Sequence, residues 1–343
     1  MIHRILSIAL AFGLVCSAFT SSAQTISVSD DSGRRVTLGA PAQRIVSLAP
    51  HTTELLFAAG AGDRVVGVDE YSNYPPAVAS ITSVGSALQL DLERLLALRP
   101  DLVVVWSGGH PETMIEKLEA LGLTVFRSEP RQLDDVASNL ERLGQLAGTP
   151  AQALQAARAF RQDLAQLRRE YQDRPRVRVF YQIWHQPLMT VNGEHLISKV
   201  MALCGGENIF ADLPTLAPQV STEAVVVADP QAIIASGKAL ERPDWLQAWL
   251  KWEALTAVKL DSVYVIHPDL IQRHTPRILQ GAQQMCRHLE EVRGKLGLAG
   301  RATSNPVNGA VHVRRPGSNR QVEAQIPRGA GTARGEGTRL APH

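Results

Sequence analysis

Residues 149–173 read TPAQALQAARAFRQDLAQLRREYQD, and this stretch decides the fold. Thr149 stands where a helix cap is expected, and Pro150 follows it at the first helical position. Neither Gly nor a further Pro interrupts the run, and Pro175 ends it. Apolar side chains recur every three or four positions, at Leu154, Ala157, Phe160, Leu164, Leu167 and Tyr171. This period predicts one amphipathic helix of about 24 residues, which would be roughly 36 Å long.

Short strand-like runs alternate with helical segments on both sides of this long helix. The apolar runs lie at residues 44–48, 65–68, 102–106 and 124–126 before it, and at 177–183, 232–235 and 263–266 after it. Such alternation predicts an α/β protein with two Rossmann-like lobes and largely parallel sheets. Because a helix resists bending, we expect the rigid backbone helix to let the lobes close only slightly on a ligand cleft between them.

A hairpin and several shorter helices, one of them over residues 92–98, are also expected. A turn at residues 31–34 predicts a small hairpin over 25–40. Thr52 or Thr53 is expected to cap a helix that begins near Pro50. Further amphipathic helices are expected at 112–121 and 276–296.

An internal sequence repeat indicates that the chain uses one architectural unit twice. Residues 93–104 read ERLLALRPDLVV, and residues 223–234 read EAVVVADPQAII. In both copies a Glu precedes a short apolar turn, a Pro follows at the same offset, and a strand-like run begins. Self-similarity of this kind is typical of repeated units, here two lobes with a cleft between them.

The two ends of the chain lie outside the predicted lobes. Residues 1–23 combine His3 and Arg4 with an apolar run and the small residues Ser21, Ser22 and Ala23, which is typical of a signal peptide cleaved near Ala23. The mature protein is therefore expected in the periplasm. Residues 298–343 are rich in Gly, Arg, Pro and Ser and are expected to form a disordered tail. Between them we expect an N lobe at 24–148, the connecting helix at 149–174 and a C lobe at 175–297.

Charge and cysteine content narrow the class of protein. The formal net charge of +2 gives no reason to expect a nucleic-acid partner. Removal of the signal peptide leaves Cys204 and Cys286, and two thiols in an oxidising compartment usually pair. We therefore expect a disulfide, with two separate buried thiols as the alternative.

Enzyme and metal motifs are absent from the sequence. It contains no GxSxG, P-loop or GxGxxG pattern, so we expect a binding protein rather than an enzyme, with no catalytic residues and no cofactor. The histidines are scattered, without HxH or HExxH spacing, and we expect no metal site; the histidines concerned are His51, His110, His185, His195, His267 and His274.

Several motifs together carry a resemblance to a known family. They are RIVSLAP at 44–50, TELLFAAG at 53–60, YSNYPP at 71–76, PDLV at 100–103, CGGENIF at 204–210, PQVS at 218–221 and PRI at 276–278. The chain resembles, over residues 25–297, the helical-backbone class of periplasmic solute-binding proteins. These proteins supply ABC importers and carry haem, iron–siderophores, metals or cobalamin.

Within that class the motifs most resemble cobalamin-binding members, for which a disulfide like Cys204–Cys286 is also typical. The resemblance implies that Tyr71 in the N lobe, together with Asp269 and Arg273 in the C lobe, contacts the corrin. Trp106 fits a wall of the cleft. Asp269 and Arg273 are four residues apart and could instead pair with each other. The ligand is then reversibly bound cobalamin or a related corrinoid, with haem, an iron–siderophore or a divalent metal as alternatives.

One departure from the cobalamin-binding pattern concerns aromatic residues. Ala87 and Ala217 stand where relatives carry Trp. Trp184 is the candidate replacement, and ordinary packing is the alternative reading for it and for the other aromatic residues.

The resemblance also implies a role for Glu93 and Glu223, the first residues of the two repeat copies. In the class, paired acidic residues dock onto arginines of the two permease subunits, and the resemblance assigns this role to Glu93 and Glu223. The expected partner is thus an ABC permease dimer with its ATPase in the inner membrane, and the protein itself is expected to be a monomer. A favourable position at a helix N-terminus is the simpler explanation for both residues.

Overall fold

The computed structural model describes residues 25–237 and 244–298, with the side chains of residues 244 and 245 left out. The predicted signal peptide and the predicted tail after residue 298 lie outside these residues. Within the described ranges, none of the helices combines the length and apolar character that crossing a bilayer requires.

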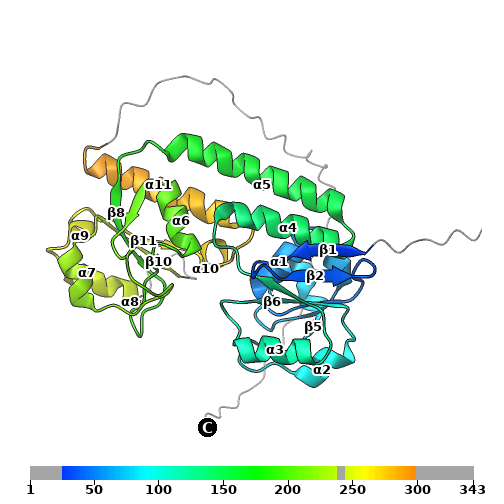
Figure 1. Ribbon diagram of the computed structural model, residues 1–343. Coiled ribbons are helices and arrows are strands. Elements are labelled where there is room, and N and C mark those ends of the chain that lie inside the picture. The colour runs from blue at the N-terminus through cyan, green and yellow to red at the C-terminus, as the bar shows by residue number, and fades with distance from the viewer. Residues whose placement is uncertain (1–24, 238–243, 299–343) are drawn as a thin grey trace, which may run out of the picture. The chain divides into compact units, whose positions relative to one another are not determined.

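The N lobe, drawn from blue to green in Figure 1, is built on a five-stranded parallel sheet in the order β5-β4-β3-β6-β7. Its strands are β3 (Ile45–Ser47), β4 (Val65–Val68), β5 (Thr82–Ser83), β6 (Leu102–Trp106) and β7 (Val125–Ser128). Its helices are α1 (Pro50–Ala58), α2 (Leu92–Ala97), α3 (Glu112–Ala120) and α4 (Leu133–Ala147). The predicted hairpin is present as the antiparallel pair β1 (Ile26–Ser29) and β2 (Arg35–Leu38).

The C lobe repeats the same plan with a four-stranded parallel sheet in the order β11-β10-β8-β9. Its strands are β8 (Val177–Gln182), β9 (Gly206–Asn208), β10 (Ala232–Ser236) and β11 (Val263–Ile266). Its helices are α6 (Leu196–Leu203), α7 (Thr222–Ala228), α8 (Asp244–Gln247), α9 (Thr256–Lys259), α10 (Pro268–Ile271) and α11 (Ile278–Lys295). In each lobe the first strand (β3 or β8) lies between the second strand and a third that follows α2 or α7.

The internal sequence repeat corresponds to equivalent structure in the two lobes. Arg44 Nε donates to the carbonyl of Leu98 at the end of α2, and Arg178 Nη2 donates to the carbonyl of Ala228 at the end of α7. Leu98 and Ala228 occupy the same offset from Glu93 and Glu223. Each arginine thereby satisfies a terminal helix carbonyl that has no partner within its own helix.

Helices α2 and α7, which belong to the two copies of the repeat, end in the same backbone conformation. Arg99 and Asp229 both adopt a positive φ, of 44° and 40°, immediately before a proline. The left-handed conformation stops the helix and the proline prevents its continuation. One local unit is therefore used twice, as the sequence indicated.

The predicted connecting helix is α5 (Pro150–Tyr171), which lies beside α4 at one end and beside α6 and α11 at the other (Figure 1). Leu154, which the apolar period placed on the inner face, is exposed, and Ala153 is buried in its place. The reason is Gly144 of α4, which has no side chain and lies directly against the Ala153 Cβ. Close approach of the two helices leaves room there for a methyl group only.

Two predicted helix caps have a different structure from the one expected. Ala49, not Thr52 or Thr53, is the cap residue of α1, and both threonine hydroxyls donate to its carbonyl. Thr149 does occupy the cap position of α5, but its hydroxyl donates to the Ala59 carbonyl at 2.7 Å. Its side chain therefore joins α5 to the end of α1 instead of satisfying an amide of α5.

Helix α4 was not predicted, although its sequence carries a signal. Its buried residues follow a helical period, and the Asp135 side chain accepts a hydrogen bond from the Gln132 backbone amide in a capping box. The helix ends at Gly148, whose φ of 67° is left-handed. With α5, it forms the extended helical contact that supports the N lobe.

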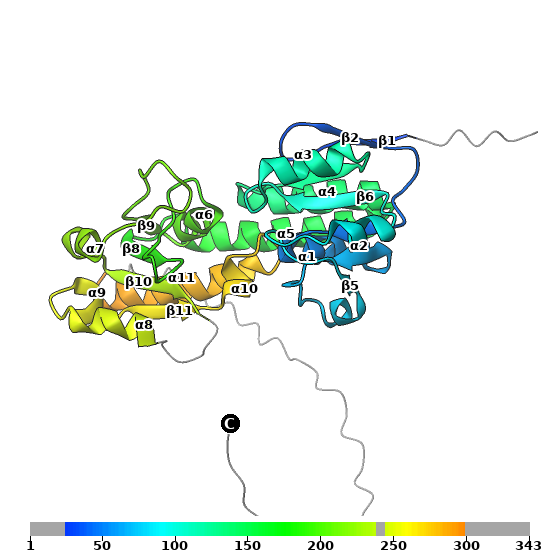
Figure 2. The same cartoon turned by 90° about the horizontal axis from the view of Figure 1, so that it is seen from below.

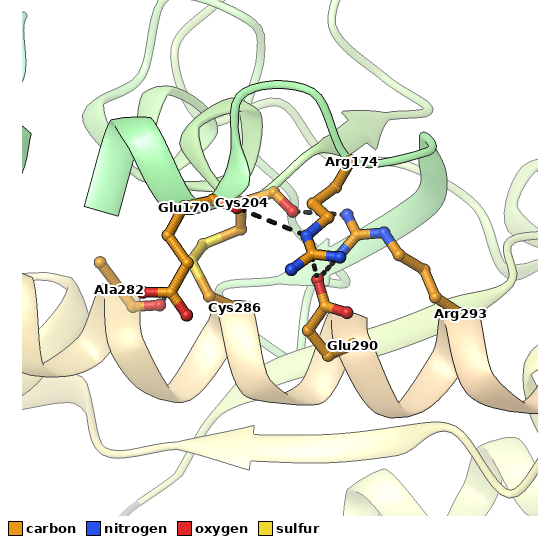
Figure 3. The surroundings of a disulfide bond; sticks show 7 residues. All are labelled: Glu170, Arg174, Cys204, Ala282, Cys286, Glu290 and Arg293. Carbon is orange, nitrogen blue, oxygen red and sulfur yellow. Dashed lines mark hydrogen bonds and ion pairs between the residues drawn. A yellow bond between two sulfur atoms is a disulfide. The ribbon is translucent and has the colours of Figure 1, made fainter. Parts of the chain in front are cut away.

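Cys204 and Cys286 form the predicted disulfide, which joins the end of α6 to α11 (Figure 3). The buried Arg293 lies beside it and donates to the carbonyls of Cys204 and Pro175 as well as to the Glu290 carboxylate. The disulfide and this arginine together fix α11 to the segment where the chain leaves α5.

Candidate functional site

The N lobe presents its first candidate residues where two parallel strands end. After β3 the chain turns into α1, which carries His51, and β6 ends at Trp106. These neighbouring strands lead to connections that leave toward opposite sides, and crevices at such points of α/β sheets commonly bind ligands. His51 and Trp106 meet there edge to face, with ring centroids 5.4 Å apart.

A C-lobe residue completes this ring cluster. His274, between α10 and α11, lies 5.6 Å from His51 and 6.4 Å from Trp106, measured between ring centroids. His195 at the start of α6 lies 6.1 Å from His274, and the ring of His110 is hydrogen-bonded to the Trp106 carbonyl. The histidines are thus gathered at the lobe boundary, which their sequence spacing did not show.

The clustered histidines are held neutral. Burial, followed by the nearby His274, His110 and Arg273, lowers the pKa of His51 well below its usual value. Burial also lowers the pKa of His274 to about 3 and that of His195 to about 4. A charged imidazole is poorly solvated in such surroundings, so the boundary carries rings without charge.

Beside the rings lies a buried group of charges that joins α1 of the N lobe to the segment that follows α10 in the C lobe. Figure 2 shows the ribbons of α1 and α10 at this boundary. Glu54 of α1 is 4% exposed and accepts from Arg277 Nε at 2.9 Å and Nη2 at 2.5 Å. Arg273 Nη1 donates to the same carboxylate at 2.8 Å. One N-lobe side chain therefore binds two C-lobe arginines. The sequence analysis did not single out Glu54 or Arg277, because only the fold brings them together.

The segment 71–76 adds two further contacts to these arginines. Arg273 Nη1 also donates to Asn73 Oδ1 at 2.7 Å, and the Arg277 guanidinium lies 3.9 Å from the centre of the Tyr74 ring. On the C-lobe side, Arg273 Nη2 pairs with Asp269 Oδ1 at 3.1 Å. The pairing considered as an alternative for Asp269 and Arg273 is thus present in the structure.

Tyr71 and Trp184 are the exposed members of the predicted set. Tyr71 is 65% exposed and follows Asp69, whose carboxylate accepts from the Tyr71 amide. Burial is the main reason that the pKa of Asp69 is raised to about 6. Trp184 follows β8, is exposed, and donates from Nε1 to the Gln186 carbonyl. Both rings are available for contact with another molecule.

Comparison with known proteins gives this geometry a context. A family model described as periplasmic binding protein matches residues 45–270, which is more than half of the chain. The chain belongs to the periplasmic binding protein family. The predicted class of two α/β lobes joined by one long helix is thereby confirmed.

Named relatives of this periplasmic binding protein include vitamin B12-binding proteins. That of Vibrio cholerae is 41% identical over 251 residues, which cover 73% of this chain and 90% of the relative. That of Yersinia pestis is also 41% identical over 251 residues, covering 88% of the relative. Both names describe binding proteins rather than enzymes, as the sequence analysis expected for this chain.

Solved structures show the same likeness. The periplasmic vitamin B12-binding protein BtuF of Vibrio cholerae superposes with a TM-score of 0.70 at 40% identity, covering 74% of this chain and 98% of that one. A periplasmic heme-binding protein from Pseudomonas aeruginosa gives 0.61 at 28% identity, covering 71% and 91%. This binding protein therefore shares its fold with proteins of both names.

Glu93 and Glu223, the first residues of the two repeat copies, occupy equivalent exposed positions away from the ring cluster. Glu93 and Glu223 lie in the first turns of α2 and α7, whose N-caps are Asp91 and Ser221. A pocket of about 450 Å³ lies beside Glu223 and includes the Trp249 and Trp252 side chains. A second pocket, of about 460 Å³, is lined by Leu92 beside Glu93 and by residues of α3. Glu223 thus lines one surface depression, and Leu92, the sequence neighbour of Glu93, lines another.

Proposed function

We propose that the protein binds cobalamin or a related corrinoid between its lobes and delivers it to an ABC importer. The relatives named for vitamin B12 support this proposal, because they match at 40–41% identity over most of their own length. The proposal includes export, with signal-peptide cleavage near Ala23 and action in the periplasm.

The proposed ligand site consists of Tyr71 and Trp106 from the N lobe and Trp184, Asp269 and Arg273 from the C lobe. A corrin is broad and apolar on its faces and carries amides on its rim, so it needs aromatic surfaces and a few polar partners. Asp269 can accept from an amide N–H and Arg273 can donate to an amide carbonyl. Rings and polar groups of both kinds are present in this set.

The charge balance of the ion-pair group is the observation that favours a corrinoid over haem or an iron–siderophore. Glu54 and Asp269 supply two negative charges, and Arg273 and Arg277 supply two positive charges, all in direct pairs. The group is therefore neutral as a whole. Haem propionates and anionic siderophores would need unpaired cations to replace their hydration, whereas the uncharged amides of a corrinoid need only hydrogen bonds.

A divalent metal ion is the weakest of the alternatives. In the part of the chain that the structure describes, no group of three or more His, Cys, Asp or Glu side chains is arranged to hold a metal. The clustered histidines are buried against one another and against Trp106 instead.

Docking to the permease is the second half of the proposal. Glu93 and Glu223 are exposed on equivalent helices, so a two-fold permease dimer can meet each with the same basic residue. Each of the two helices has an exposed apolar side chain in it or shortly before it: Val227 is 86% exposed in α7, and Leu88, four residues before α2, is 89% exposed. We propose that these two helices form the contact with the permease, whose ATPase completes the importer, and that the binding protein acts as a monomer.

Calorimetric titration of the mature protein with cyanocobalamin, haemin and divalent metal ions tests the ligand. We expect one-to-one binding of cyanocobalamin, with its visible colour retained by the protein after desalting. Tighter binding of haemin or of a metal ion, with no heat from cyanocobalamin, would overturn the proposal. Turnover of a substrate by the same preparation would instead indicate an enzyme.

A further inference from the structure

Glu54 is buried in the N lobe and pairs with Arg273 and Arg277 of the C lobe, so it links the two halves of the proposed site. We propose that Glu54 is a positioning residue: from the N lobe it orients Arg273 of the C lobe for ligand binding and holds the lobes in register. This inference rests on the proposed function, since Arg273 is one of the proposed ligand contacts.

The first support is the way in which Arg273 is held. Its Nη1 donates to Glu54 at 2.8 Å and to Asn73 at 2.7 Å, while its Nη2 pairs with Asp269 at 3.1 Å. Two of the three partners belong to the N lobe. The direction of the guanidinium is therefore set mainly by residues of the opposite lobe, and Glu54 supplies the charged one.

The second support is the geometry of Glu54 itself. Its two oxygens accept from Nε and Nη2 of Arg277 in a two-bond pairing, which fixes the carboxylate more firmly than a single contact. Glu54 also lies on α1, directly after β3, so its backbone is rigid. Removing one partner of a buried ion pair strongly destabilises the folded protein, because the remaining charge is left buried without compensation.

The third support is a link to the segment that carries Tyr71. Asn73 binds Arg273, and the Tyr74 ring lies under the Arg277 guanidinium. Because Glu54 fixes both arginines, it indirectly fixes residues 71–76 as well. The N-lobe aromatic contact and the C-lobe polar contact of the proposed site therefore depend on the same carboxylate.

A double-mutant cycle on the purified protein tests this role. Glu54→Gln keeps the size of the side chain and removes its charge, and we expect cyanocobalamin affinity to fall about 10- to 100-fold, which corresponds to about 1.4 to 2.7 kcal/mol. In an Arg273→Ala background, the same change should lower affinity by less than about 2-fold further. An undiminished effect in that background, or unchanged affinity of the single variant, would show that Glu54 does not act through Arg273.

A matched control separates positioning from the loss of any ion pair. Glu141 of α4 makes a similar two-bond pair with Arg161 of α5, away from the lobe boundary. Glu141→Gln should leave cyanocobalamin affinity unchanged. A drop equal to that of Glu54→Gln would assign the effect to general destabilisation and overturn the inference.

A measurement without ligand distinguishes failure of this inference from failure of the proposed function. Spin labels attached at Glu93→Cys and Glu223→Cys, one on each lobe, report the distance distribution between the lobes. We expect Glu54→Gln to broaden the distribution and Glu141→Gln to leave it unchanged. If the wild-type protein does not bind cyanocobalamin but Glu54→Gln still broadens the distance distribution, the ligand proposal fails. The role of Glu54 in holding the lobes in register then stands. An unchanged distribution contradicts that role whatever the ligand.

A milder substitution covers the case in which Glu54→Gln does not fold. Asn73→Ala removes one exposed acceptor of Arg273 without leaving a buried charge. It should weaken cyanocobalamin binding in the same direction, by a smaller factor, and lose this effect in the Arg273→Ala background. Additive effects of the two substitutions would contradict the inference.

Discussion

His51 of the N lobe and His274 of the C lobe lie against each other across the lobe boundary, with ring centroids 5.6 Å apart and planes tilted by 47°. Neither His51 Nε2 nor His274 Nδ1 has a hydrogen-bond partner among the described residues. Both rings are neutral, because burial disfavours their charged forms. The contact therefore requires that neither histidine gains a proton.

This requirement predicts that acid weakens the protein. The unfolded chain protonates His274 near its ordinary pKa of 6.5, whereas the folded chain does so only near 3. Stability present above pH 6.5 should therefore fall as the pH drops from about 6.5 toward about 3, at about 1.4 kcal/mol for each unit of pKa difference. Urea unfolding between pH 7 and pH 4 measures this loss, which we expect to reach a few kcal/mol.

Substitution of His274 tests whether its buried ring is the source of the acid sensitivity. His274→Asn should flatten the pH dependence of the unfolding free energy, while the same change at the exposed His185 should preserve it. An equally steep dependence in His274→Asn would assign the acid sensitivity to other groups.

Trp106 is expected to contribute strongly to ligand affinity. Truncation of an aromatic hot-spot residue costs about 2 kcal/mol or more. We expect Trp106 to be such a residue, so Trp106→Ala should weaken cyanocobalamin binding at least about 30-fold. Trp252→Ala serves as control, because Trp252 lines the pocket beside Glu223 instead. Calorimetry of both variants decides, and equal affinities would remove Trp106 from the ligand site.

Reversal of the two exposed glutamates should separate transport from binding. The double variant Glu93→Arg with Glu223→Arg places like charges against the proposed basic residues of the permease, so uptake of labelled cobalamin should be lost. Calorimetric affinity for cyanocobalamin should stay at the wild-type value, since neither residue belongs to the ring cluster.

A control with the same change of charge supports this reading. Glu116 of α3 and Glu207 of β9 are exposed glutamates outside α2 and α7. Their joint replacement by Arg should leave uptake intact. Normal uptake by the Glu93 and Glu223 variant would leave those residues with a role only in their helix N-termini.

The disulfide should stabilise the folded protein without affecting ligand binding. Cys204 and Cys286 are 82 residues apart, and closing a loop of that length corresponds to about 4.5 kcal/mol in the chain-entropy description. Replacement of both by Ala should lower the melting temperature by about 10 °C. Cyanocobalamin affinity at 25 °C should be retained, and a large loss of affinity would place the bond in the site itself.

Local patterns in the sequence were enough for the architecture. The apolar period of residues 150–171 and the absence of Gly and of any Pro after Pro150 predict α5, because helix formation depends on neighbours three and four positions apart. The copies beginning at Glu93 and Glu223 predict two equivalent helix–strand units for the same reason. The predicted disulfide needed only the two cysteines that follow the predicted signal peptide.

Contacts between distant segments were decided by the tertiary structure alone. Glu54 and Arg277 are 223 positions apart, and the histidines at the lobe boundary come from four separate segments, so no spacing rule relates them. The burial of Ala153 in place of Leu154 likewise depends on Gly144 of another helix. Hydrogen bonds, charge pairing and close packing act between atoms that are near in space, and that nearness exists only once the lobes have folded and met.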